Sequence, residues 1–136
     1  MSLILDASVT LSWYFEDERT SSGEALMDRV AADGAVVPLL WRYEVANAFF
    51  KAIRRRRIAI AYRDASLQEL RHFPIVVDRG GEELSWASTL SLADRFQLSI
   101  YDASYLELAL RRGLPLATSD RALRAAAQAL AIEALG

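Results

Sequence analysis

Four acidic residues, Asp6, Glu44, Asp102 and Asp120, are spaced along the chain in a way that could bring their carboxylates together. Converging carboxylates repel one another by about 4 kcal/mol per close pair at an effective dielectric near 20. Such a cluster persists only with raised pKa values or with bound cations. Oxygen ligands select hard cations, so the acids predict a site for Mg²⁺ or Mn²⁺. Such ions activate water for phosphodiester hydrolysis.

The elements that must position these acids alternate between apolar strands and amphipathic helices. Strands are predicted at 3–5, 36–37, 75–77 and 114–118, with an edge strand at 131–135. Helices are predicted at 20–32, 41–57, 86–96 and 101–111, with others through 67–70 and from 120 to 130. This order predicts a three-layer α/β/α sandwich with a short, mainly parallel sheet. Without a linker, repeat or low-complexity stretch, we expect a single domain over residues 1–136.

The predicted strand ends place two acids at one edge. Asp6 directly follows the first strand and Asp120 follows the fourth, and ligands bind beyond the carboxyl ends of parallel strands. Asp102 stands in the first turn of its helix, where its neighbours four and seven residues on are apolar, so its carboxylate should face the protein. Glu44 lies near the start of its helix, with Asn47 on the same side.

Ordinary helix capping is the competing interpretation. Asp6, Asp102 and Asp120 each stand at a helix beginning, where an aspartate stabilises the first turn without any further role. Capping does not explain Glu44. It also does not explain why the two strand-end acids would share an edge with two inward-facing acids, so we favour the cation site.

Composition narrows the function classes. The chain has no cysteine and His72 is its only histidine, which disfavours a zinc site and excludes a thiol nucleophile. There is no signal-like leader and no apolar run of the roughly 20 residues that a membrane helix needs. We therefore expect a soluble cytoplasmic protein. The net charge of −2 is unlike that of a general nucleic-acid binder.

Four segments, in order, resemble the motifs of one family. They are Leu5-Asp6-Ala7-Ser8, Glu44-Val45-Ala46-Asn47, Tyr101-Asp102-Ala103-Ser104-Tyr105-Leu106 and Leu116-Ala117-Thr118-Ser119-Asp120. Each motif alone is weak, but the ordered set covers nearly the whole chain. It resembles the PIN domain family and, within that family, the VapC-type toxins of bacterial toxin–antitoxin pairs.

The resemblance implies a role for each matched residue. Asp6, Glu44, Asp102 and Asp120 would be the metal and water ligands, Ser8 and Thr118 polar supports for them, and Asn47 a further support. It also implies a magnesium-dependent (or manganese-dependent) endoribonuclease, a homodimer, and a cognate antitoxin whose tail blocks the groove. The alternative is a PIN-like module that holds RNA or a protein without cutting. An aspartate-nucleophile phosphatase would need a second acid where Ser8 stands, so we set it aside.

A basic run and a group of aromatic residues each allow more than one interpretation. The basic run Arg54, Arg55, Arg56 and Arg57 could form a phosphate-contacting rim, but a solvated helix end is favoured. Seven aromatic residues crowd two predicted helices and could stack on bases, fill the core, or form a surface for a second copy or an antitoxin. They are Trp13, Tyr14, Phe15, Trp41, Tyr43, Phe49 and Phe50.

Overall fold

Five short strands form one parallel sheet in a computed structural model that describes all 136 residues. The strands are β1 (Ile4–Leu5), β2 (Ala35–Pro38), β3 (Ile75–Asp78), β4 (Leu116–Ala117) and β5 (Ala134–Leu135). The helices are α1 (Ala7–Ser12), α2 (Ser21–Asp33), α3 (Leu40–Arg54), α4 (Ile60–Leu70), α5 (Ser88–Phe96), α6 (Ile100–Arg112) and α7 (Arg121–Ala129). Two 3₁₀ turns lie at Glu16–Glu18 and Glu82–Leu84.

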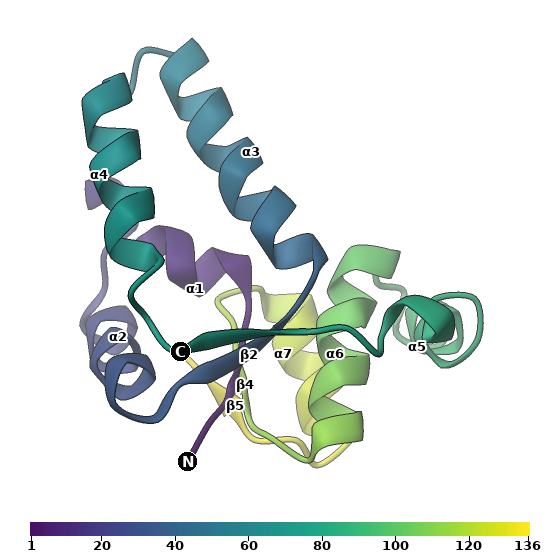
Figure 1. Cartoon of the computed structure of the whole chain (residues 1–136). Coiled ribbons are helices and arrows are strands. Elements are labelled where there is room, and N and C mark those ends of the chain that lie inside the picture. Colours follow the sequence, from purple (N-terminus) through teal and green to yellow (C-terminus); the bar gives the residue numbers. More distant parts are fainter.

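The strand order β3-β2-β1-β4-β5 sets where a ligand can bind. The chain runs outward from β1 through β2 to β3, then crosses back to β4 and continues to β5. Helices α1 and α2 lie on one side of the strands, and α5, α6 and α7 lie on the other (Figure 1). The order therefore reverses between β1 and β4, and ligands of open parallel sheets bind at such a reversal. The predicted three-layer α/β/α architecture is confirmed.

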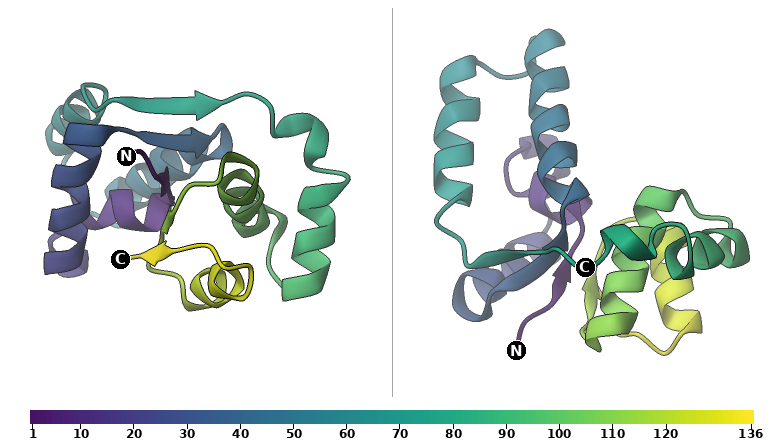
Figure 2. Two further views of the ribbon diagram at one scale, coloured as in Figure 1. Left: turned by 90° about the horizontal axis from the view of Figure 1, so that it is seen from below. Right: turned by 45° about the vertical axis from the view of Figure 1, so that its right-hand side comes forward.

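A continuous core holds the layers together. It comprises 30 buried apolar side chains, and Leu3, Ile4 and Leu5 at the central strand are fully buried. Strand β5 pairs in parallel with β4, as the predicted edge strand requires. Helices α3 and α4 form a hairpin that projects from the sheet (Figure 2). None of the helices combines the length and the apolar character needed to cross a lipid bilayer.

Four predicted boundaries were wrong. The helix expected to reach Arg57 ends at Arg54, because the chain turns there and Arg56 takes a left-handed conformation with φ 57°. The helix expected to include Trp86 begins only at Ser88, after a 3₁₀ turn. The strand predicted at 114–118 pairs only over Leu116–Ala117, and the edge strand predicted at 131–135 forms only over Ala134–Leu135. All four differences arise in connecting segments, where periodicity carries little information.

Candidate metal centre

Asp6 is held by two hydroxyl groups at the end of β1. Its Oδ2 accepts hydrogen bonds of 2.7 Å from both Ser8 Oγ and Thr118 Oγ1. Each hydroxyl oxygen in turn accepts a backbone N–H, from Ser119 at 3.2 Å and from Asp120 at 3.0 Å. An ionised carboxylate can only accept hydrogen bonds, so both hydroxyls donate their protons to Asp6. Both hydroxyls donate to Oδ2, so Oδ1 accepts neither of these hydrogen bonds.

Helix capping does not account for Asp6. The residue occupies the N-cap position of α1, but its side chain makes no capping hydrogen bond. Only 4% of Asp6 is exposed, and burying a carboxylate is costly unless it is compensated. The two hydroxyls supply part of that compensation. They leave the carboxylate without a cationic partner.

Glu44 approaches the same region from α3. Its Oε1 accepts a 2.6 Å hydrogen bond from the hydroxyl of Tyr105, which lies on α6. The Tyr105 hydroxyl also accepts the N–H of Ala7 at 3.4 Å, directly beside Asp6. The charges of Asp6 and Asp102 both act on Glu44, which places the three acids in one electrostatic neighbourhood.

Asp102 and Asp120 complete the set from α6 and α7. Helix α6 is capped by Ser99, whose hydroxyl accepts the N–H of Asp102, so Asp102 is not the cap. Asp120 is a true cap, because its Oδ1 accepts the N–H of Leu123 at 2.9 Å. The capping interpretation is therefore correct for Asp120 only. Both carboxylates are half-buried, as the predicted inward orientation of Asp102 requires.

The pKa values of three acids are raised. For Asp6, burial raises the pKa most, the Ser8 and Thr118 hydrogen bonds oppose it, and the charge of Asp120 adds to it. Burial is also the largest cause that raises the pKa of Glu44. The Tyr105 hydrogen bond lowers this pKa, and the charges of Asp6 and Asp102 raise it. For Asp102, burial is followed by the charges of Asp120 and Asp6. Burial is thus the largest cause in all three acids and the charge of another acid of the set adds to it, so a bound cation would stabilise their ionised forms.

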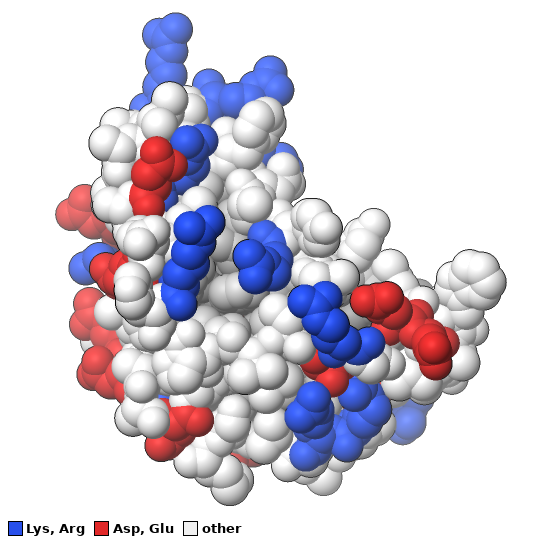
Figure 3. Space-filling view, viewed as in Figure 1, with Lys and Arg blue, Asp and Glu red and all other residues white.

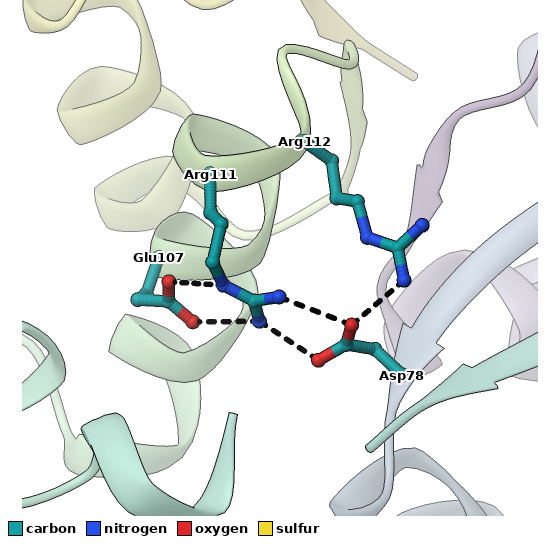
Figure 4. Close-up of polar contacts among 4 residues, drawn as sticks. All are labelled: Asp78, Glu107, Arg111 and Arg112. Carbon is teal, nitrogen blue, oxygen red and sulfur yellow. Dashed lines mark hydrogen bonds and ion pairs between the residues drawn. The ribbon is translucent and has the colours of Figure 1, made fainter. Parts of the chain in front are cut away.

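Asp78, at the end of β3, shows how the same fold treats a structural acid. Arg111 donates to both of its oxygens at 3.1 and 2.7 Å, Arg112 adds a bond at 2.8 Å, and Arg111 also binds Glu107 (Figure 4). These hydrogen bonds and charges hold the pKa of Asp78 well below its usual range. None of Asp6, Glu44, Asp102 and Asp120 forms an ion pair. Arginines thus pair the structural acid but not the four predicted site acids.

The four acids have the right ligand atoms for a hard cation, but their side chains do not yet converge on one point. All four candidate ligands offer carboxylate oxygens, the type that Mg²⁺ and Mn²⁺ prefer. No three His, Asp or Glu side chains are arranged closely enough to hold a metal ion as they stand. The four acids nevertheless share one region of the fold, because the charge of at least one other member of the set acts on each of Asp6, Glu44 and Asp102.

The other predicted site residues separate into those near the acids and those away from them. Ser8 and Thr118 contact Asp6 directly. Asn47 is exposed on α3 and makes no side-chain hydrogen bond. The run from Arg54 to Arg57 lies at the tip of the α3–α4 hairpin, where basic side chains project (Figure 3). Ten residues of helix, about 15 Å, separate Arg54 from Glu44.

Arg57 and the aromatic residues have structural partners. Arg57 pairs with Asp17 at 2.9 Å and lies over the ring of Phe15, which fixes the end of the basic run on the protein. Of the seven aromatic residues, five are buried in the core: Trp13, Tyr14, Phe15, Trp41 and Phe49. Tyr43 is 71% exposed and Phe50 is 54% exposed, so these two remain available for contacts outside the chain.

Tyr105 is the contributor that sequence reasoning missed. It belongs to the family-like segment Tyr101–Leu106, three residues after Asp102 on the same face of α6, but the resemblance gave it no role. An aromatic residue on a buried helix face is ordinarily interpreted as part of the hydrophobic core. Nothing in the chain pattern indicates that its hydroxyl reaches Glu44, 61 residues away in sequence.

Comparison with known proteins agrees on one family. The PIN domain family matches residues 3–129. A protein named Ribonuclease VapC3 from Mycobacterium tuberculosis is 34% identical over 122 residues, covering 89% of this chain and 84% of that protein. A Ribonuclease VapC3 from Pyrobaculum aerophilum is 33% identical over 125 residues, covering 90% and 92%. The crystal structure of PAE2754 from Pyrobaculum aerophilum aligns with a TM-score of 0.63 and 27% identity, covering 93% of this chain and 87% of that one.

Proposed function

The chain belongs to the PIN domain family, in its VapC-type group, and from this premise we propose that it is a metal-dependent endoribonuclease acting as the toxin of a toxin–antitoxin pair. The relatives named ribonuclease support cleavage of RNA. The proposal includes a cognate antitoxin and a homodimer, as the resemblance to VapC-type toxins implies.

One observation carries the enzymatic part of this proposal. Four carboxylates surround the reversal point between β1 and β4, and none has a basic partner, although arginines neutralise Asp78 elsewhere in the same fold. A binding module that never holds a cation has no physical reason to keep repelling acids unpaired. A site that binds Mg²⁺ or Mn²⁺ has one, because the cation would balance their charge.

The residues divide the work between ligation and support. Asp6, Glu44, Asp102 and Asp120 would hold Mg²⁺ or Mn²⁺, and the chemistry such an ion supplies is activation of water and stabilisation of charge on the phosphodiester. Ser8 and Thr118 fix one oxygen of Asp6 and leave the other for binding. The hydroxyls are neutral donors, so they orient the carboxylate without cancelling the charge that attracts a cation. RNA would bring its scissile phosphate to this edge of the sheet.

Metal binding and RNA cleavage can be tested in one set of measurements. Purified chain, freed of any antitoxin, should cleave RNA with Mg²⁺ or Mn²⁺ and not with EDTA. Mn²⁺ should raise the thermal unfolding temperature of the wild type but not of Asp6→Asn. Asp28→Asn is the matched control, because Asp28 is an exposed acid on α2 outside the proposed site. If the wild type binds Mn²⁺ but leaves every RNA uncut, the ribonuclease assignment is wrong while the metal site stands.

A further inference from the structure

A buried tyrosine hydroxyl joins two elements of the proposed site. Tyr105 is fully buried in α6, and its hydroxyl makes two hydrogen bonds. It donates to Glu44 Oε1 at 2.6 Å and accepts the N–H of Ala7 at 3.4 Å. Ala7 opens α1, whose first N–H groups have no partner within the helix. The hydroxyl thus satisfies one of these groups while it holds a side chain of α3.

The direction of the two bonds is fixed by chemistry. An ionised carboxylate can only accept and a backbone N–H can only donate, so the Tyr105 hydroxyl gives its proton to Glu44 and accepts the N–H of Ala7. Burial, and then the negative charges of Glu44 and Asp6, raise the pKa of Tyr105, so its hydroxyl stays a neutral donor. Oε1 of Glu44 is therefore held in place. Oε2 accepts no hydrogen bond and remains for another ligand.

The same arrangement recurs around Asp6. There, the Ser8 and Thr118 hydroxyls each accept a backbone N–H and donate to the same carboxylate oxygen, Oδ2. Tyr105 repeats this pattern for Glu44, because its hydroxyl accepts the Ala7 N–H and donates to one carboxylate oxygen, Oε1. The Tyr105 hydroxyl thereby links Glu44 on α3 to the start of α1.

We propose that Tyr105 is a positioning residue that fixes Glu44 relative to the Asp6 end of β1 and so sets the carboxylate geometry for a divalent cation. It acts through Glu44, without contacting RNA itself. Asp102 stands on the same face of α6 three residues earlier, so one rigid helix face presents both a site acid and the tether for another. This inference rests on the proposed function, because positioning matters only where the acids bind a cation.

Tyr105→Phe tests the inference, since it removes the hydroxyl and keeps the ring. The matched control is Tyr14→Phe, because the Tyr14 hydroxyl also donates to a glutamate, Glu69, at 3.3 Å, away from the acids. Mn²⁺ alone would be titrated into each full-length variant by calorimetry. Loss of a partner that orients a metal ligand weakens metal affinity about 10-fold or more. We expect that loss for Tyr105→Phe and unchanged affinity for Tyr14→Phe.

A double-mutant cycle separates positioning from general destabilisation. If Tyr105 acts through Glu44, then Tyr105→Phe should cause no further loss of Mn²⁺ affinity in a Glu44→Ala background. Equal losses in both backgrounds, or a lower unfolding temperature with unchanged Mn²⁺ affinity, would overturn the inference and leave the proposed function intact. If wild type itself binds no Mn²⁺, the proposed metal site fails and this inference fails with it.

Discussion

Thr118 Oγ1 lies 2.7 Å from Oδ2 of Asp6, although 112 residues separate them in sequence. The contact ties the end of β4 to the end of β1 across the point where the strand order reverses. Thr118 is fully buried and also accepts the N–H of Asp120. One hydroxyl therefore orders the backbone of the loop before α7 and orients the most buried acid of the proposed site.

Thr118→Val should weaken both stability and cation binding. Valine has nearly the same shape, so the loss of the two hydrogen bonds should dominate, at about 1–3 kcal/mol of unfolding free energy. Because the Thr118 hydrogen bond lowers the pKa of Asp6, its loss raises that pKa further. Mn²⁺ affinity should then fall more at pH 5.5 than at pH 8, as measured by calorimetry.

The control for this change is another buried threonine. Thr10→Val removes the acceptor for Trp41 Nε1 at 3.0 Å and should cost stability in urea unfolding. It should not change how Mn²⁺ affinity depends on pH, because the Thr10 hydroxyl donates at 3.5 Å to the backbone carbonyl of Asp6 and not to its carboxylate. An equal pH dependence in the two valine variants would show that Thr118 does not tune Asp6.

Metal-free stability should depend on pH through Asp6. Its pKa is raised in the folded protein, so its favourable contribution is complete below the unfolded value of 3.8 and is lost as pH rises through the folded value. Each pH unit between the two values corresponds to about 1.4 kcal/mol. In EDTA, Asp6→Asn should therefore gain stability relative to wild type as pH rises from 4 to 8.

Thermal unfolding across that pH range checks the sign. Saturating Mn²⁺ should reverse the order at pH 8 and make the wild type more stable than Asp6→Asn, because the cation stabilises only the intact carboxylate set. A wild type that is already more stable than Asp6→Asn in EDTA at pH 8 would contradict the view that Asp6 is an uncompensated charge.

The predictable part of the site lies in strand ends and helix periodicity. A carboxylate directly after a parallel strand must lie at the carboxyl edge of the sheet, so Asp6 and Asp120 could be placed at one edge. The apolar neighbours of Asp102 indicated which face of its helix it occupies. Pairwise contacts could not be predicted in this way. Periodicity gives the direction of a side chain from its own helix but not its partner, so neither the Tyr105–Glu44 bond nor the Asp78–Arg111 pair was foreseen.

The predicted ends of two helices were wrong for a related reason. The arginines after Arg54 all favour helix, yet the chain turns there toward α4, and the turn lets Arg57 pair with Asp17. Tertiary packing overrides local propensity at that point. Trp86 likewise suited an apolar helix stripe, although it is 92% exposed in the segment before α5.

The two arginines at Asp78 should contribute very differently to stability. Arg111 holds both Asp78 and Glu107, whose side chains are 4% and 7% exposed, so Arg111→Ala leaves two nearly buried carboxylates without a cation. Breaking such a pair costs about 3–5 kcal/mol. Arg112 is 43% exposed and makes one contact, so Arg112→Ala should cost about 1 kcal/mol or less.

Urea unfolding of both variants at pH 7 and in acid tests this difference. The pKa of Asp78 is lowered in the folded protein, so its contribution is present above pH 3.8 and is lost as pH falls through the folded value. The penalty of Arg111→Ala should therefore shrink in strong acid. Similar penalties for the two alanine variants would mean that Arg112 replaces Arg111 once it is removed.

Asp120 allows its capping role to be separated from a role in cation binding. Its Oδ1 caps α7, and asparagine caps helices about as well as aspartate. Asp120→Asn should therefore keep metal-free stability, whereas Asp120→Ala should lose about 1 kcal/mol. Both should lose Mn²⁺ affinity to a similar extent, because each removes the charge. For comparison, Asp102→Asn and Asp102→Ala should both keep the cap of α6, which Ser99 provides. If Asp120→Asn retains wild-type Mn²⁺ affinity, Asp120 is only a helix cap, and the cation site consists of the other three acids.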